Sequence, residues 1–258
     1  MRASMTAVGI AAALWASPLQ AQDLLATRSG WEVGGQVARY HYEEPDFMWL
    51  EGDRVGVAGS YTLASEKRVY SRFEVRWSYG ELDYQGSGTL QGVPDYLLEA
   101  RVLAGRDYPV GKVVWSPYVG AGIRLLHNDL RGVSSTGQRG YRRESTYFYL
   151  PLGVTLRMPL GADWALAPQL EYDGFIRGVQ RSYLSDTGLG ASDVTNRQRQ
   201  GRGYRAQLML EGRRWSFGPW LDYWNVKDSD VQPIGMGLAG MEPANWTREA
   251  GVELRYRF

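Results

Sequence analysis

The sequence predicts an all-β protein, a ten-stranded antiparallel up-and-down β-barrel that crosses a membrane. Three observations lead to this fold. Segments of alternating apolar and polar residues recur along the chain. The connections between them alternate between short and long, and aromatic residues stand at the ends of the segments. No segment beyond the amino end offers the ~20 apolar residues of a transmembrane helix. A chain that spans the membrane must then do so as a closed sheet.

The final segment, residues 246–258, has the clearest alternation, which is unbroken from Ala250 onward. One face is apolar and the other is charged, as expected for a strand with one side toward lipid. The chain ends on Phe258, with Tyr256 and Leu254 at alternate positions before it. This ending resembles the assembly signal of Gram-negative outer-membrane β-barrels. The resemblance implies a location in the outer membrane and insertion by the barrel assembly machinery.

The amino end, residues 1–21, has the pattern of a secretory signal peptide. Arg2 supplies a positive charge, an apolar run extends from Ala7 to Ala16, and residues 18–21 form a small-residue cleavage site. The apolar run is too short to span a bilayer as a helix. We therefore expect residues 1–21 to be removed and residues 22–258 to form a single barrel domain.

The rest of the chain divides into strands and connections. We expect strands at residues 31–42, 53–63, 68–84, 95–107, 113–127, 144–158, 164–182, 203–212, 214–226 and 246–258. The connections at 64–67, 108–112, 159–163 and 212–213 are short, and those at 43–52, 84–94, 128–144, 183–201 and 227–245 are long. Outer-membrane barrels have short periplasmic turns and long extracellular loops, so both termini are expected on the periplasmic side.

Aromatic residues mark one edge of the predicted barrel. Trp31, Trp115, Trp164 and Trp215 each stand at the beginning of a strand that runs outward, and Phe258 ends the last strand. Trp prefers the boundary between water and membrane because its ring is apolar and its N–H is polar. We expect all five residues at the periplasmic rim.

Four prolines disagree with the strand pattern. A central strand loses a ladder donor wherever proline occurs. We therefore expect bulges or rim positions at Pro117, Pro151, Pro168 and Pro219.

The lumen-facing residues include many charged side chains of both signs. A ten-stranded barrel is narrow, and unpaired charges in a confined interior are costly, so we expect these side chains to pair and fill the lumen. A selective channel would favour an excess of one sign, although a narrow porin-like channel stays an alternative. The predicted network consists of Arg72, Glu74, Arg76, Glu99, Arg101, Glu171, Asp173, Arg205, Glu253 and Arg255.

In size and topology the chain resembles the omptin outer-membrane proteases, whose site is an Asp pair facing an Asp–His pair across an extracellular groove. The matching residues here are few. His127 with Asp129, and His41 with Asp46, are the candidates for a general base and an orienting carboxylate. The family's closely spaced Asp pair before Trp is absent, because the segment Pro45–Trp49 contains one Asp. A hydrolase acting on protein or lipid is therefore the alternative rather than the main prediction.

The composition limits the classes of ligand and partner that we expect. The chain has no cysteine, so it offers neither disulfides nor thiolate chemistry, and its formal net charge of +1 gives no reason to expect nucleic acid. The loop carboxylates lack the spacing of a calcium loop, so we predict no metal and no cofactor. Basic clusters at 139–143 and 197–202 are candidates for lipopolysaccharide phosphates. We expect a monomeric, non-enzymatic barrel that serves membrane structure or surface interaction through its loops.

Overall fold

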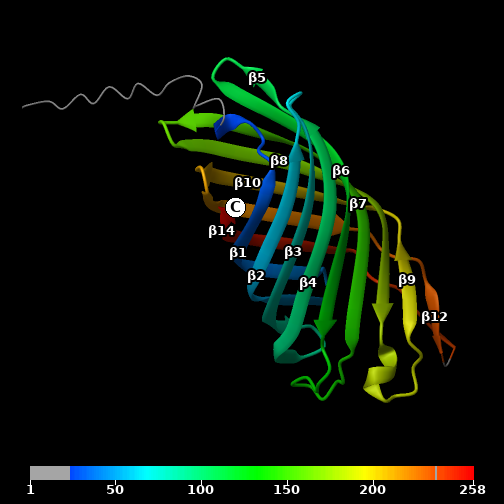
Figure 1. Cartoon of the computed structure of the whole chain (residues 1–258). Coiled ribbons are helices and arrows are strands. Elements are labelled where there is room, and N and C mark those ends of the chain that lie inside the picture. Colours follow the sequence, from blue (N-terminus) through cyan, green and yellow to red (C-terminus); the bar gives the residue numbers. More distant parts are fainter. Residues whose placement is uncertain (1–23, 236) are drawn as a thin grey trace, which may run out of the picture.

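The structure is a computed structural model that describes residues 24–235 and 237–258, so the expected signal peptide lies outside the described residues. The chain forms one closed antiparallel sheet of ten long strands, which confirms the predicted fold (Figure 1). Each long strand pairs with its neighbours in sequence, and β14 returns to pair with β1. The long strands are β1 (Gly30–Glu44), β2 (Met48–Ala64), β3 (Val69–Gln85), β4 (Thr89–Arg106), β6 (Val113–Asp129), β7 (Arg142–Leu160), β8 (Trp164–Ser182), β10 (Gly201–Glu211), β11 (Trp215–Val226) and β14 (Asn245–Arg257).

The shorter elements lie in the connections. At the periplasmic end, β5 (Tyr108–Val110) pairs with the start of β6. At the outer end are a 3-10 helix, η1 (Leu184–Thr187), the strand β9 (Val194–Gln198), and a small hairpin of β12 (Gln232–Gly235) and β13 (Leu238–Gly240). β9 pairs with the last residues of β8, so the sheet continues past the barrel there. Among the described residues, no helix is long and apolar enough to cross a membrane.

The strands extend further outward than the sequence pattern indicated. Residues 43–52 and 84–94 were expected as loops, but β1 and β2 are separated by three residues, and so are β3 and β4. Asp46 makes the first turn possible with a positive φ of 69°, a conformation that Asp tolerates better than most residues. A membrane-spanning strand needs about 9–11 residues, so these hairpins stand above the bilayer. The connections that remain long are the third outer loop (residues 130–141), the fourth (183–200) and the fifth (227–244).

The predicted strand faces are confirmed. In β3, Phe73 and Trp77 are exposed on the outer wall, whereas Arg76 points into the barrel. In β14, Val252 and Leu254 are exposed and Glu253 between them is buried. The outer wall is therefore apolar at membrane height, as lipid contact requires.

The aromatic periplasmic rim also forms as predicted. Trp31, Trp115 and Trp215 are all about half exposed at the first residues of their strands. Trp215 packs on Tyr256, which in turn contacts Phe258, with ring centroids 4.8 and 5.2 Å apart.

The prolines behave differently from the prediction of bulges. The register shifts in the barrel sheet lie between Leu82 and Tyr84 and between Phe148 and Tyr149, and neither shift contains a proline. At Pro219 the ladder between β10 and β11 instead skips from the pair Gln207–Trp220 to the pair Leu210–Phe217. The lost N–H interrupts the pairing there, and the strand continues without an extra residue.

The barrel interior is filled at three heights. The middle contains charged side chains, as predicted. The outer half contains an apolar cluster that the sequence analysis did not predict. Its buried members are Tyr40, Tyr42, Leu50, Leu82, Val93, Leu97, Leu126, Leu130, Tyr147, Tyr149, Trp224 and Val226. At the periplasmic mouth, Leu24 and Leu25 pack against Val114 and Ala165, so the segment before β1 enters the barrel.

Candidate functional site

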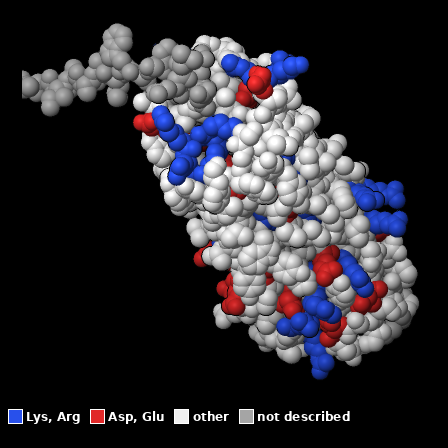
Figure 2. Space-filling model, in the orientation of Figure 1, with Lys and Arg blue, Asp and Glu red and all other residues white. Residues whose placement is uncertain are grey.

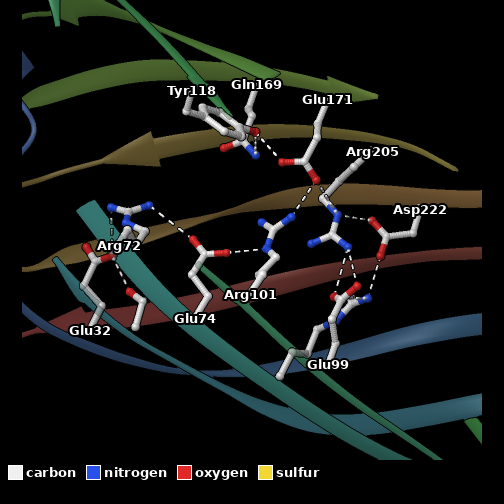
Figure 3. Close-up of polar contacts among 12 residues, drawn as sticks. Glu32, Arg72, Glu74, Glu99, Arg101, Tyr118, Gln169, Glu171, Arg205 and Asp222 are labelled. Atoms are coloured by element: carbon white, nitrogen blue, oxygen red, sulfur yellow. Dashed lines mark hydrogen bonds and ion pairs between the residues drawn. The ribbon is translucent and has the colours of Figure 1, made fainter. Parts of the chain in front are cut away.

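The centre of the lumen is a network of arginines that each contact more than one carboxylate (Figure 3). Arg205 of β10 lies 3.0 Å from both Glu99 of β4 and Asp222 of β11. Arg76 of β3 lies 2.6 Å from Asp222 and 3.2 Å from Glu99. Two arginines and two carboxylates from four strands therefore form one closed ring, which joins opposite sides of the barrel. Tyr149 donates a further hydrogen bond to Glu99 at 2.7 Å.

The network continues toward the periplasm through Arg101. Its Nε lies 2.6 Å from Glu74 and its Nη1 lies 2.5 Å from Glu171. Glu171 also accepts a hydrogen bond from the Tyr118 hydroxyl at 2.6 Å, and Gln169 donates to that hydroxyl at 2.7 Å. Figure 3 shows this chain of contacts reaching from Glu171 back to the Arg205 group.

The periplasmic end of the network is looser. Arg72 lies 3.5 Å from Glu74 and 3.7 Å from Glu32, and Glu32 also pairs with Arg257. Arg255 makes two hydrogen bonds of 2.7 Å with its strand neighbour Glu253. The structure thus brings together nine of the ten residues that the sequence predicted as a lumen charge network, in two groups.

Asp173 is the exception. It lies in the lumen and is fully buried, but neither carboxylate oxygen has a hydrogen-bond partner among the described residues. The alternation of β8 correctly placed it inside the barrel. The alternation could not show which inward-facing charges lie within contact distance of one another, because these distances depend on the stagger between strands.

A second buried ion pair, further out, was missed by the sequence analysis. Asp95 of β4 accepts hydrogen bonds from Arg54 of β2 and from Asn128 of β6, and Arg54 also lies 3.6 Å from Glu249. All four side chains are buried. Asp95 was expected as the first residue of its strand, where the face is ambiguous. Glu249 is four residues before Glu253 and lies on the same face of the last strand, so extending the alternation toward the start of that strand would have identified it.

The outer mouth is closed by a contact between loop and barrel. Arg143 of β7 pairs with Glu44 at the end of β1 and with Glu242 of the fifth outer loop, and all three are buried. Tyr42 donates a hydrogen bond of 2.7 Å to Glu44. Burial raises the pKa of Glu242 to about 7, and the neighbouring Glu44 carboxylate acts in the same direction against the opposing effect of Arg143. Arg143 was expected on the surface, and the structure corrects this placement.

The periplasmic mouth is closed by the segment before β1. The backbone N–H and the hydroxyl of Thr27 both donate to the carboxylate of Asp107, at 2.6 and 2.8 Å. Ser116 donates to the same carboxylate at 2.6 Å, and Arg157 donates to the Thr27 hydroxyl at 3.2 Å. These buried contacts tie the amino-terminal segment to β6 and β7.

The catalytic candidates do not face a common cavity. His41 lies on the outer wall of β1, 2.7 Å from Glu51 and stacked against Trp246. His127 lies on the outer wall of β6 and stacks on Tyr96, with centroids 4.6 Å apart.

The carboxylates proposed for these histidines do not contact them. Asp129 hydrogen-bonds Arg131 in the next turn, at 2.6 and 2.8 Å. Asp46 is exposed at the tip of the first outer turn. The His127–Asp129 and His41–Asp46 pairs expected from the sequence are therefore not formed. Within the part of the chain that the structure describes, no group of three or more His, Asp or Glu side chains could hold a metal.

A belt of aromatic rings surrounds part of the outer wall at its extracellular end. Tyr223, Trp246, His41 and Trp49 follow one another across β11, β14, β1 and β2, with centroid distances of 6.4, 4.8 and 6.2 Å. Aromatic residues were expected only at the periplasmic edge of the barrel. This second row explains the position of His41, whose ring is one member of the stack.

Arginines are exposed on the same end of the wall. Arg177 and Arg181 of β8 flank Val179, and Val179 pairs with Arg197 of β9. The guanidinium of Arg177 stacks on Phe148 at 4.5 Å. Further exposed arginines are Arg199, Arg202 and Arg248. On the face shown in Figure 2, charged side chains gather most densely at the outer end, and the wall between the two ends is mainly uncharged.

Comparisons with known proteins agree with this architecture. The family profile of the outer membrane protein beta-barrel domain matches residues 9–200. The solved structure of the outer membrane protease OmpT from Escherichia coli is similar, with a TM-score of 0.54 and 10% identity over 89% of this chain and 94% of OmpT. The toluene transporter TodX from Pseudomonas putida gives a TM-score of 0.38 and 11% identity over 92% of this chain and 91% of that one.

The likeness to OmpT shows the fold alone, because the identity is only 10%. No curated protein sequence matches the chain. The family match, in contrast, covers well over half of the sequence and agrees with the closed barrel and the apolar outer wall. This chain is an integral protein of the outer membrane and belongs to the outer membrane protein beta-barrel domain family.

Proposed function

We propose that this protein is a closed, non-enzymatic barrel that acts through its extracellular end. The observation that carries the proposal is the filled lumen, which contains the amino-terminal segment, the ion-pair network and the apolar cluster in succession. The cavity within the charge network has a volume of only about 40 Å³. A site for one water needs about 10–15 Å³ by this measure, so the cavity has room for only a few waters, which supports a lumen that is closed to larger solutes.

The partner we propose is lipopolysaccharide. Its phosphates would contact the exposed arginines on β8 and β9, because guanidinium groups bind phosphate through two parallel hydrogen bonds. Arg177 and Arg181 lie two residues on either side of Val179, the cross-strand partner of Arg197, and none of the three arginines makes an ion pair with a described carboxylate. The aromatic belt of Trp49, His41 and Trp246 supports a membrane boundary at this height.

Lipopolysaccharide binding by the refolded barrel tests this proposal. In the double variant Arg177→Ala/Arg181→Ala, affinity for lipopolysaccharide should fall by about tenfold or more, since each charge-assisted hydrogen bond contributes about 1.5–3 kcal/mol. Arg106→Ala is the matched control, because Arg106 is also exposed but lies at the periplasmic end of β4. Affinity for lipopolysaccharide is measured by calorimetry. Equal affinity in the wild type, the double variant and the control would show that Arg177 and Arg181 do not bind lipopolysaccharide.

The hydrolase alternative has a direct test. Refolded protein with lipopolysaccharide is offered a mixed peptide library and phospholipid vesicles, and products are read by mass spectrometry beside His127→Ala. We expect no product that depends on His127, because its ring faces outward and stacks on Tyr96. A product that disappears in the variant would overturn the non-enzymatic function.

A further inference from the structure

The lipid-facing wall contains an apolar groove at its periplasmic half, remote from the extracellular end. The groove extends across β8, β10, β11, β14 and β1 to Gly56 of β2 and has a volume of about 850 Å³. Its outward-facing side chains include Val37, Leu208, Leu210, Phe217, Val252 and Leu254.

The hollow has a local cause. Gly35 of β1 faces outward and has no side chain, whereas Val37 and Leu254 beside it are 53% and 50% exposed and stand out from the wall. Pro219 also lines the groove, at the point where the ladder between β10 and β11 is interrupted. Small residues in the floor and large residues around it make a concavity in the wall.

The groove lies in the periplasmic leaflet. Leu254 pairs with Phe217, and two residues further along these strands Tyr256 pairs with Trp215 at the aromatic rim. Strand residues rise about 3.4 Å each, so the groove begins roughly 7 Å from the rim. Lipopolysaccharide occupies the opposite leaflet, which leaves glycerophospholipid acyl chains to fill this space.

A cationic group stands at the periplasmic end of the groove. Arg214 precedes Trp215, is exposed, and donates a hydrogen bond of 3.2 Å from Nη1 to the Tyr256 hydroxyl. Arg214 makes no ion pair with a described carboxylate, whereas its neighbour Arg213 pairs with Asp163 at 3.3 Å. The tyrosine holds the guanidinium beside the end of the groove with its remaining N–H groups available.

We propose that this groove and Arg214 form a binding site for one glycerophospholipid of the periplasmic leaflet. The two acyl chains lie in the groove over Gly35, and the phosphate accepts hydrogen bonds from Arg214. The apolar lining supplies the affinity for the chains, and the charge selects a phosphate-bearing headgroup.

Native mass spectrometry of the full barrel, refolded in detergent and titrated with phosphatidylglycerol, tests the site. Wild-type protein should retain one lipid. In Gly35→Leu, which fills the floor, and in Arg214→Ala, the fraction with one lipid should fall by about tenfold, as expected for losing a contact of about 1.4 kcal/mol or more. Gly59→Leu is the matched control, because Gly59 also faces outward, in β2, outside the groove.

The two glycines have equal room for a side chain, since the nearest atoms to an added Cβ are at 3.9 Å for Gly35 and 3.8 Å for Gly59. Retention of lipid at the wild-type level by Gly35→Leu and Arg214→Ala would overturn the site. Equal retention of a diacylglycerol with the same chains would refute the phosphate contact. A heat-dependent gel shift confirms that each variant is folded, and Arg214→Ala at an exposed turn keeps the test open if Gly35→Leu fails to fold.

Discussion

At the scale of single residues, the lumen charges depend on one another. Arg205 and Arg76 share Glu99 and Asp222, so no member of this ring has a single partner. A charge taken out of water costs several kcal/mol, and only partners with good geometry offset that cost. Removing one arginine leaves two carboxylates buried with less compensation. The network therefore offsets the cost of burying charged side chains in a narrow barrel. This role explains why the numbers of positive and negative side chains in the network are nearly equal.

The ring gives a quantitative prediction. Arg205→Ala should lower the free energy of unfolding by about 3–5 kcal/mol, because a buried pair loses one partner. It should also allow transient current in planar bilayers, where we expect no steady conductance from the wild type. Arg213→Ala is the control, since Arg213 and Asp163 are 66% and 64% exposed and such pairs contribute about 0–1 kcal/mol. Equal stability loss in both variants would contradict a structural role for the network.

At the scale of elements, the outer loops are fastened to the barrel rather than free. The third outer loop is tied to the turn between β3 and β4, where the Ser135 N–H donates to the Thr89 carbonyl and the Thr89 N–H donates to the Ser135 hydroxyl, both at 3.0 Å. The fifth is held by Glu242 on Arg143. These contacts place polar groups of the loops over the apolar cluster and close the outer mouth.

The closure of the fifth outer loop should depend on pH. The pKa of Glu242 is raised from 4.5 to about 7, so between these values the folded protein keeps a proton that the unfolded chain releases. The stabilisation of the folded loop that comes from the protonated Glu242 is therefore fully present below about pH 4.5 and is lost as the pH rises to 7. Hydrogen exchange of residues 227–244, corrected for its intrinsic pH dependence, should show weaker protection at pH 8 than at pH 5.

Two variants in the fifth outer loop distinguish the titration of Glu242 from that of other groups. Glu242→Gln should abolish the difference in protection between pH 5 and pH 8, because the amide does not titrate. Asp230→Asn should leave it unchanged. The pKa of Asp230 is lowered, chiefly by the hydrogen bond from the Arg197 backbone, and so lies below this range. A pH difference that persists in Glu242→Gln would assign the effect to another group.

At the scale of the whole molecule, the barrel must be closed by its first and last strands. β14 pairs with β1 along twelve residue pairs, from Trp246 with Glu43 to Arg257 with Glu32. Phe258 adds a single backbone hydrogen bond of 3.1 Å to Trp31 and is 77% exposed. Its side chain therefore contributes little to the folded barrel. We propose that the barrel assembly machinery recognises Leu254, Tyr256 and Phe258 before the barrel closes.

Removal of Phe258 tests this role. In cells, the truncated chain should yield several-fold less heat-modifiable barrel, whereas refolding in detergent should be nearly unchanged. The reason is that the side chain is exposed in the folded protein, so its loss removes recognition and little packing. Phe47→Ala, which removes another exposed phenylalanine at an outer turn, should assemble normally. Equal defects in cells and in detergent would make Phe258 a structural residue instead.

The sequence by itself determined the number of long strands, their faces and the membrane edge. These follow from a period of two, because each strand residue on the lipid side must be apolar regardless of its partners. The alternation around Arg76 and around Glu253 therefore predicted both faces correctly. Strand ends near Glu44 and Gln85 were predicted short, since above the membrane neither face is required to be apolar.

Only the tertiary structure decided which inward charges meet. Glu99 reaches Arg205 across 106 positions of the chain, while Asp173 reaches no partner among the described residues. The stagger of the strands sets these contacts, and a single sequence does not encode it in any local pattern. The same holds for the apolar cluster in the outer half and for Thr27 on Asp107. Alternation specifies a side of the sheet, whereas closure of the barrel specifies the neighbours on that side.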